Sequence, residues 1–307
     1  KETEIELLLY YCYKLKTFKP SINKNVTLTN IYLRQVESIE KKIMKVLITG
    51  ANRLIGQYIG KLILKSKDFL LLPTGLGNPR IKDFENFYQK LDISNSSEVK
   101  NFLITEKPDI VINCAAISHV DICEEFPDKC FKVNVLGVKN LIDNLNPQSK
   151  FIHLSSEFVF DGTSLNYKEN DQPNPLSIYG KSKLQAEEYI QQNFKNHQII
   201  RTILVFGFGE NLSRNNILTW AYSFLSQNKK IKVVNDQIRK PTYVKDLAKA
   251  IFDLMVSNQN STFHISGEEE ISIFQLAKKV ADVYGFDKNL ISSISSKSLN
   301  ELDNQHF

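Results

Sequence analysis

Short apolar segments alternate with longer amphipathic segments along most of this chain, from Met44 onward. Such alternation is typical of a parallel β-sheet whose two faces are covered by helices. The expected strands are 45–49, 69–73, 88–91, 109–114, 150–155, 199–205 and 263–266. The expected helices are 55–66, 96–106, 128–145, 177–194, 243–257 and 273–284. The pattern therefore predicts an α/β fold with a doubly wound parallel sheet.

The two ends of the chain fall outside this pattern. Residues 1–43 start with lysine and show no sustained periodicity, so we expect a leader that precedes a natural start at Met44; a regulatory arm is the alternative. Residues 208–307 carry fewer sheet-forming segments and are expected to form a smaller lobe over the carboxyl edge of the sheet. A crevice at that edge is where such folds bind ligands.

Composition excludes several classes of partner. The formal net charge of +5 comes from lysines that are scattered rather than clustered, so no nucleic-acid partner is expected. No apolar stretch approaches the roughly 20 residues of a membrane span, and no signal peptide precedes the four cysteines, so we expect a cytoplasmic protein with reduced thiols. The five histidines are dispersed, and no metal site is expected.

A glycine-bearing turn follows the first expected strand, in the segment 45–56. Gly50 would make the turn, and Gly56 would let the following helix pack close to the sheet. A strand, a glycine turn and a helix N-terminus together hold a pyrophosphate in Rossmann-type folds. We expect the turn residues to contact such a group: Gly50, Asn52, Arg53, Leu54, Ile55 and Gly56.

Tyr179 and Lys183 stand four residues apart in an expected helix, so both side chains lie on one face of it. A neighbouring ammonium group lowers the pKa of a phenol, which makes the tyrosine a usable proton donor and acceptor. The segment 151–157 reads as a strand that ends in the hydroxyl groups of Ser155 and Ser156. Together these side chains predict a site for acid–base chemistry.

The ordered set of these motifs resembles the extended short-chain dehydrogenase/reductase family, and within it the dTDP-4-dehydrorhamnose reductases. The motifs that show the resemblance are the Thr-Gly turn, the segment Ser155–Gly162, the Tyr-x-x-x-Lys pair, and Arg201-Thr202 before Val205-Phe206-Gly207. Asp236-Gln237 before Pro241-Thr242, and Phe263–Gly267, follow in the expected order. The resemblance runs from Met44 to about Ser298.

The resemblance implies an NAD(P)-binding Rossmann domain over residues 44–207 and a substrate lobe over 208–307. It implies that Ser156 bonds the substrate carbonyl, that Tyr179 donates the proton, and that Lys183 holds the nicotinamide ribose. Further residues along the dinucleotide would be Asp92, Ile93, Asn113, Ala115, Ala116 and Asn134. The implied activity is NADPH-dependent reduction of a nucleotide-linked 4-keto-sugar, in a possible homodimer.

NADP is expected over NAD because no acidic residue ends the second strand, whereas Arg80 lies within reach of a 2′-phosphate. NAD remains possible. Arg53 departs from the family, which has glycine there. Its guanidinium would either pair with phosphate oxygens or, as we expect, impair cofactor binding.

Three further departures separate this chain from the family pattern. Glu157 replaces an aspartate, Leu204 replaces an aromatic residue, and the tail after Ser298 lacks the family's proline-rich stretch and last helix, so the lobe is expected to be truncated.

Two alternatives to the reductase stay open. One is a non-catalytic dinucleotide-binding protein like the regulatory subunit of methionine adenosyltransferase, and the other is a decayed copy of the enzyme.

Overall fold

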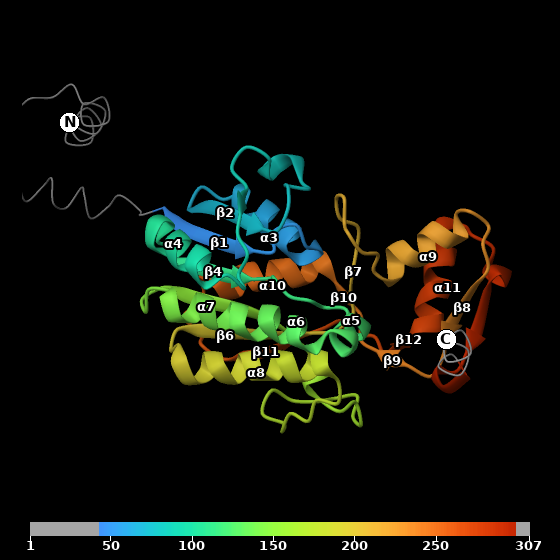
Figure 1. The fold of residues 1–307 in the computed structure, drawn as a ribbon. Coiled ribbons are helices and arrows are strands. Elements are labelled where there is room, and N and C mark those ends of the chain that lie inside the picture. Colours follow the sequence, from blue (N-terminus) through green and yellow to red (C-terminus); the bar gives the residue numbers. More distant parts are fainter. Residues whose placement is uncertain (1–42, 299–307) are drawn as a thin grey trace, which may run out of the picture. The chain divides into compact units, whose positions relative to one another are not determined.

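The computed structural model describes residues 43–298, and the expectations on the leader and on the tail after Ser298 lie outside them. A seven-stranded sheet has the order β3-β2-β1-β4-β5-β6-β11, with every neighbouring pair parallel (Figure 1). Its strands are β1 (Met44–Thr49), β2 (Phe69–Gly75), β3 (Gln89–Lys90), β4 (Ile110–Asn113), β5 (Lys150–Ser156), β6 (His197–Thr202) and β11 (Thr262–Ile265). Since the chain winds outward in both directions from β1, the switch in strand order lies between β1 and β4. The predicted doubly wound Rossmann sheet is confirmed.

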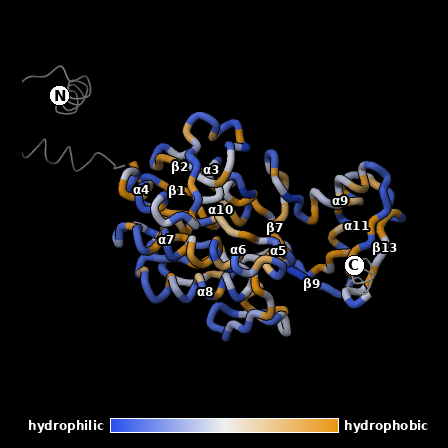
Figure 2. Tube along the Cα trace, viewed as in Figure 1, coloured by the Kyte–Doolittle hydropathy of each residue, from blue (hydrophilic) through white to orange (hydrophobic). Residues whose placement is uncertain are grey.

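Helices cover both faces of this sheet (Figure 1). Along β1, Val46 and Ile48 pack into one core and Leu47 into the other, because successive side chains of a strand point to opposite faces. The first core is closed by α3 (Leu54–Leu64) and α10 (Val244–Val256). The second is closed by α4 (Ser96–Glu106), α7 (Gly137–Asn144) and α8 (Ile178–Asn193). Figure 2 shows the hydrophilic residues that alternate with hydrophobic ones along these helices.

The expected helix 128–145 is interrupted. It consists of α6 (Pro127–Phe131), a π-helical turn η2 (Lys132–Leu136) and α7, and it is preceded by α5 (Val120–Glu125), which the sequence pattern did not predict. Inside the π-turn, Asn134 is buried and its amide contacts both the N–H and the C=O of Ile117. The wider turn therefore holds the loop that follows β4.

The expected strand 199–205 is also wrong in extent. Strand β6 ends at Thr202, and Leu204 then adopts a positive φ of 38°, which an extended strand cannot contain. The chain leaves the main sheet there, and β7 (Val205–Phe206) pairs with β10 (Thr242–Tyr243) instead. This bend carries the chain from the sheet into the remaining C-terminal elements.

The C-terminal elements have a core of their own. It joins α9 (Ile217–Leu225) and α11 (Ile273–Tyr284) to β8 (Ile231–Val234) and β13 (Ile291–Ile294), which pair in parallel. A second pair, antiparallel, joins β9 (Ile238–Arg239) to β12 (Ile271–Ser272). The 3₁₀ turns are η1 (Lys82–Phe84), η3 (Glu157–Val159) and η4 (Lys288–Leu290). Within residues 43–298, no helix is long and apolar enough to cross a membrane.

Candidate active site

The glycine turn between β1 and α3 is as tight as the sequence predicts. Gly50 has a φ of 70°, and a Cβ on it would lie 2.8 Å from the backbone nitrogen of Ala115. A Cβ on Gly56 would lie 2.6 Å from the carbonyl oxygen of Gly50. Both positions therefore exclude any side chain, and the start of α3 is held against the ends of β1 and β4.

Arg53 caps α3 in an ordinary extended conformation, with φ −78° and ψ 155°, so the backbone itself does not require glycine there. Its Nη2 donates to the carbonyl oxygen of Ala116 at 2.8 Å. No side chain caps α3, and its first turn has no acidic residue. The helix therefore presents a positive N-terminal end that can bind an anion.

Asn52 has a structural role in the same turn. Its amide donates to the hydroxyl of Tyr88 at 2.8 Å and to the carbonyl of Asn78 at 3.0 Å, and it accepts from the backbone N–H of Arg80 at 2.9 Å. These bonds fasten the glycine turn to the loop after β2. Arg80 is thereby held beside the turn.

Ser156, Tyr179 and Lys183 meet at one cavity of about 480 Å³. Ser156 ends β5, while Tyr179 and Lys183 lie one turn apart on α8, which begins after the Ser177 cap. A Cβ on Gly180 would lie 2.1 Å from the carbonyl oxygen of Phe158, so glycine lets α8 approach η3, the turn directly after β5, this closely. The predicted catalytic trio therefore lines a single cavity.

The predicted lowering of the Tyr179 pKa is wrong. Burial raises that pKa and the carboxylate of Glu157 raises it further, whereas a hydrogen bond with Ser156 opposes the shift. Lys183 does not compensate, because its ammonium contacts the carbonyl of Leu154 and lies 3.3 Å from Nε2 of His153. Spacing on one helix face placed the lysine near the tyrosine but could not show this competing partner on β5.

Burial also shifts the groups around the trio. It lowers the pKa of Lys183 to about 8, and it lowers that of His153 well below its usual value, so the imidazole is neutral at neutral pH. Glu157 accepts from the Ser156 hydroxyl at 2.9 Å, and burial raises the pKa of its carboxyl to about 7. Glu157 is thus a titratable group in direct contact with the trio, and its raised pKa could not be predicted from the motif alone.

The remaining predicted cofactor residues divide into two groups. Asn52, Arg53, Leu54, Ile55 and Ala116 line the cavity together with the trio. The others do not line it: Gly50, Gly56, Asp92, Ile93, Asn113, Ala115 and Asn134.

Polar side chains of this second group hold the sheet and α8 in place. Asn113 accepts from Thr49 at 2.6 Å and lies 3.1 Å from Nδ1 of His153, which joins β1, β4 and β5. Asp92 accepts from both the N–H and the hydroxyl of Ser94 and so shapes its own loop. Asn134 donates to the Ser182 hydroxyl at 2.9 Å, which links the π-turn to α8.

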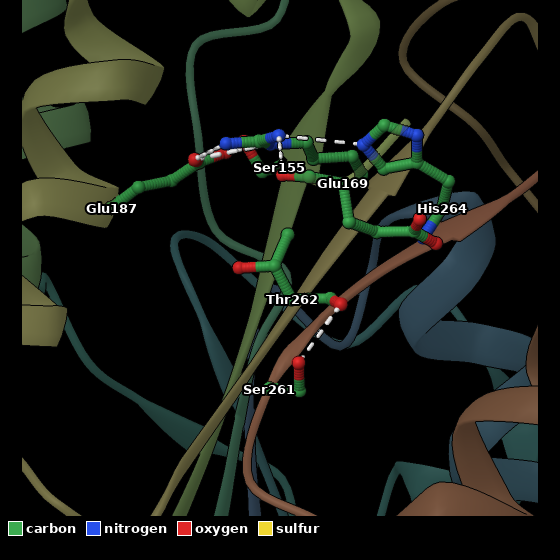
Figure 3. A network of polar contacts seen from close by, with 7 residues as sticks. Ser155, Glu169, Glu187, Ser261, Thr262 and His264 are labelled. Atoms are coloured by element: carbon green, nitrogen blue, oxygen red, sulfur yellow. Dashed lines mark hydrogen bonds and ion pairs between the residues drawn. The ribbon is translucent and has the colours of Figure 1, made fainter. Parts of the chain in front are cut away.

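A buried ion pair anchors the far end of the same helix face. Glu187 lies one turn beyond Lys183, and its carboxylate takes bonds from Arg201 on β6, the shortest at 2.6 Å, and one from the Ser155 hydroxyl. His264 on β11 lies 3.3 Å from Nη1 of Arg201. Figure 3 shows Glu187 and His264 approaching this network from opposite sides. The sequence signals for this ion pair were an acidic residue eight positions after Tyr179 and an arginine in a buried strand.

Two other features bear on what the site can bind. The C-terminal part of the chain lines the cavity with Gln237, which belongs to one of the motifs, and with Arg214, Asn216 and Arg239, which the motifs did not single out. In the part of the chain that the structure describes, no group of three or more histidine, cysteine or acidic side chains is placed to hold a metal ion.

Comparison with known proteins places this geometry in a family. The family model described as the RmlD substrate binding domain matches residues 44–303. The chain is 29% identical over 257 residues to methionine adenosyltransferase 2 subunit beta of Bos taurus, covering 82% of this chain and 75% of the relative. It is 32% identical over 204 residues to the spore coat polysaccharide biosynthesis protein SpsK of Bacillus subtilis (strain 168), covering 66% and 70%.

Solved structures agree with this placement. A dTDP-4-dehydrorhamnose reductase from Clostridium acetobutylicum ATCC 824 superimposes with a TM-score of 0.73 at 32% identity, covering 83% of this chain and 85% of that one. The same enzyme from Bacillus anthracis str. Ames, in complex with NADP, gives 0.71 at 27% identity, with coverage of 83% and 85%. The chain therefore belongs to the RmlD substrate-binding-domain family, within the extended short-chain dehydrogenases/reductases.

Proposed function

We propose that this chain reduces a nucleotide-linked 4-keto-sugar with NADPH, as the two similar solved reductases are named to act on dTDP-4-dehydrorhamnose. The observation that carries the proposal is that Ser156, Tyr179 and Lys183 line one cavity with the uncapped start of α3. The glycine turn, the helix end and Arg53 fit a dinucleotide's phosphates. The cofactor, when bound, supplies the hydride.

The protein's own contribution is to orient the carbonyl and supply a proton. Ser156 would donate a hydrogen bond to the carbonyl oxygen, and Tyr179 would give its phenolic proton to the oxygen as negative charge develops there. The raised pKa of Tyr179 keeps the phenol protonated, and hence a proton donor, at neutral pH. Lys183 would hold the ribose hydroxyls of the dinucleotide.

NADP is favoured over NAD by the loop after β2. That loop holds no acidic residue before Asp83, and Arg80 is fixed next to the glycine turn through Asn52. Its guanidinium can pair with a 2′-phosphate, whereas NAD would need a carboxylate there. Competitive titration with NADPH and NADH tests this preference.

The direct test of the reductase is NADPH oxidation with an enzymatically generated dTDP-4-keto-6-deoxy sugar, for the unaltered chain and for Tyr179→Phe. We expect Tyr179→Phe to lower turnover roughly 100-fold or more, which is typical for loss of a general acid. The NADPH affinity of this variant should stay within about twofold, since the change removes only one hydroxyl. Equal turnover of the two proteins would contradict the role of Tyr179.

A second candidate function follows from the relatives named as subunits. Similarity to methionine adenosyltransferase 2 subunit beta over 82% of this chain favours a non-catalytic dinucleotide-binding protein as the alternative. It predicts NADPH binding with no oxidation for any keto-sugar nucleotide offered. The decayed-copy alternative instead predicts that the unaltered chain binds neither dinucleotide.

A further inference from the structure

A segment after β7, residues 207–216, is fastened to the first half of α3, and we call it the strap. Gln57 donates to the carbonyl of Glu210 at 2.8 Å and accepts from its N–H at 2.9 Å. Tyr58 donates to the carbonyl of Phe208 at 2.8 Å, and Lys61 pairs with the Glu210 carboxylate. The strap is therefore positioned before any ligand binds.

The strap brings a second arginine to the cavity that Arg53 lines. Nη1 of Arg214 donates to the carbonyl of Ser118 at 3.3 Å, and Nη2 of Arg53 donates to the carbonyl of Ala116 at 2.8 Å. The two guanidinium groups are thus anchored two residues apart on one loop, from two different elements. Both side chains line the cavity that holds Tyr179 and Lys183.

These positive charges have no acidic counterpart among the described residues. Across residues 43–298, no carboxylate forms an ion pair with Arg53, Arg80 or Arg214. Burial lowers the pKa of Arg53, and the charges of Arg80 and Arg214 lower it further. The uncapped start of α3 adds its positive end at the same place.

The chemistry of this arrangement selects a particular anion. A guanidinium has five N–H donors, and one carbonyl contact leaves most of them free. Two such groups beside a helix N-terminus match a group with several oxygens and at least two negative charges. A diphosphate ester meets both conditions, whereas a single carboxylate would leave one arginine unpaired.

We propose that Arg53 and Arg214 clamp the diphosphate group of a nucleotide from two sides, Arg53 from the start of α3 and Arg214 from the strap. This inference deepens the proposed function, on which it rests for the nucleotide nature of the ligand. It replaces the expectation that Arg53 impairs binding, because the arginine becomes a ligand of the group that its side chain approaches. The diphosphate belongs either to the dinucleotide or to the sugar nucleotide.

Calorimetric titration tests the clamp and separates the two sources. The probes are NADPH, ADP-ribose and dTDP, each measured at low and at moderate salt. The variants are Arg214→Gln, Arg214→Lys and Arg53→Gln, with Lys232→Gln on β8 as a control cation outside the cavity. Thermal unfolding of each variant confirms that it is folded.

We expect Arg214→Gln and Arg53→Gln each to weaken binding of one diphosphate about tenfold or more, as loss of a charge-assisted hydrogen bond does. The affinity of Arg214→Lys should lie between those of the unaltered chain and of Arg214→Gln, since lysine keeps the positive charge but loses the paired N–H donors of the guanidinium. The salt dependence of binding should also become shallower in the Gln variants. A loss confined to ADP-ribose and NADPH assigns the clamp to the dinucleotide, and a loss confined to dTDP assigns it to the substrate.

Three results would overturn the clamp. One is that the Gln variants bind every probe within about twofold of the unaltered chain, and another is that they bind more tightly. The third is that the unaltered chain binds none of the three probes. Because these titrations need no turnover, a chain that fails the reductase assay can still show the clamp, and the two proposals fail separately.

Discussion

Single residues around Tyr179 have protonation states set by burial more than by charged neighbours. Burial is the largest cause of the pKa shifts of Tyr179, Lys183, His153 and Glu157. Lys183 is left with a pKa of about 8 and Glu157 with one of about 7, close to neutral pH. Its carboxyl is therefore the group in this site whose charge changes most between mildly acidic and mildly basic conditions.

Glu157 makes stability depend on pH. Its folded-state pKa is raised above the ordinary 4.5, so its contribution to the free energy of unfolding is fully present below about 4.5 and is lost as the pH rises through about 7. Glu157→Gln should therefore raise the free energy of unfolding by about 1–2 kcal/mol more at about pH 8 than at about pH 5. Urea unfolding at the two pH values measures this difference.

The matched control is Glu188→Gln, which removes the same kind of carboxyl from an exposed position on α8. A Glu157→Gln variant with equal effects at the two pH values would show that the Glu157 carboxyl is not held protonated by its surroundings.

At the scale of elements, the site depends on how closely α8 lies against the end of β5. Gly180 follows Tyr179 on α8, and its missing side chain leaves room for the carbonyl oxygen of Phe158. Gly137 in α7 is also a helical glycine, but a Cβ there would meet the flexible end of Ile93, at 2.7 Å from Cδ1. An added side chain at Gly180 would therefore meet rigid backbone, whereas one at Gly137 would meet a side chain that can move.

Gly180→Ala should destabilise the protein although alanine is the better helix former by about 1 kcal/mol. The clash with backbone should cost about 1–3 kcal/mol and displace Tyr179, so turnover should fall along with the free energy of unfolding. Gly137→Ala should cost less and leave turnover unchanged. Urea unfolding and steady-state rates of both variants test this, and equal behaviour of the two would contradict the steric argument.

At the scale of the whole molecule, the network around Arg201 joins α8 to three strands of the sheet. Arg201 and Glu187 are nearly inaccessible to solvent, with side chains 6% and 1% exposed. Removing one partner of such a pair leaves the other charge buried without compensation, whereas removing both does not. The pair therefore contributes more to holding the elements in register than a surface ion pair would.

Arg201→Met and Glu187→Leu should each lower the free energy of unfolding by about 3–5 kcal/mol. The double variant should be destabilised by clearly less than the sum, since no uncompensated charge remains. Urea unfolding of the four proteins in this cycle gives the coupling free energy. Additive effects would show that the two charges do not depend on each other.

The sheet was predictable from the sequence because each strand and helix has a local periodicity. The boundaries failed at Leu204 and within 132–136, where a positive φ and a π-turn depend on contacts with distant segments. The trio was predictable because Tyr179 and Lys183 share a helix face. The orientation of Lys183 toward Leu154, the position of Arg214 at the cavity and the half-buried carboxyl of Glu157 were not, because each depends on which segments the fold brings together.

The π-turn at 132–136 has a consequence for how this region tolerates insertions and deletions. One additional residue in a regular α-helix would rotate all that follows by about 100°, given 3.6 residues per turn, whereas the wider π-turn takes up the additional residue within itself. Deleting a residue such as Val133 would restore a regular helix locally. The faces of α6 and α7 would then stay aligned, but Asn134 would shift away from Ile117 and Ser182, so a shorter chain here would keep the helix and lose the link that the wide turn makes.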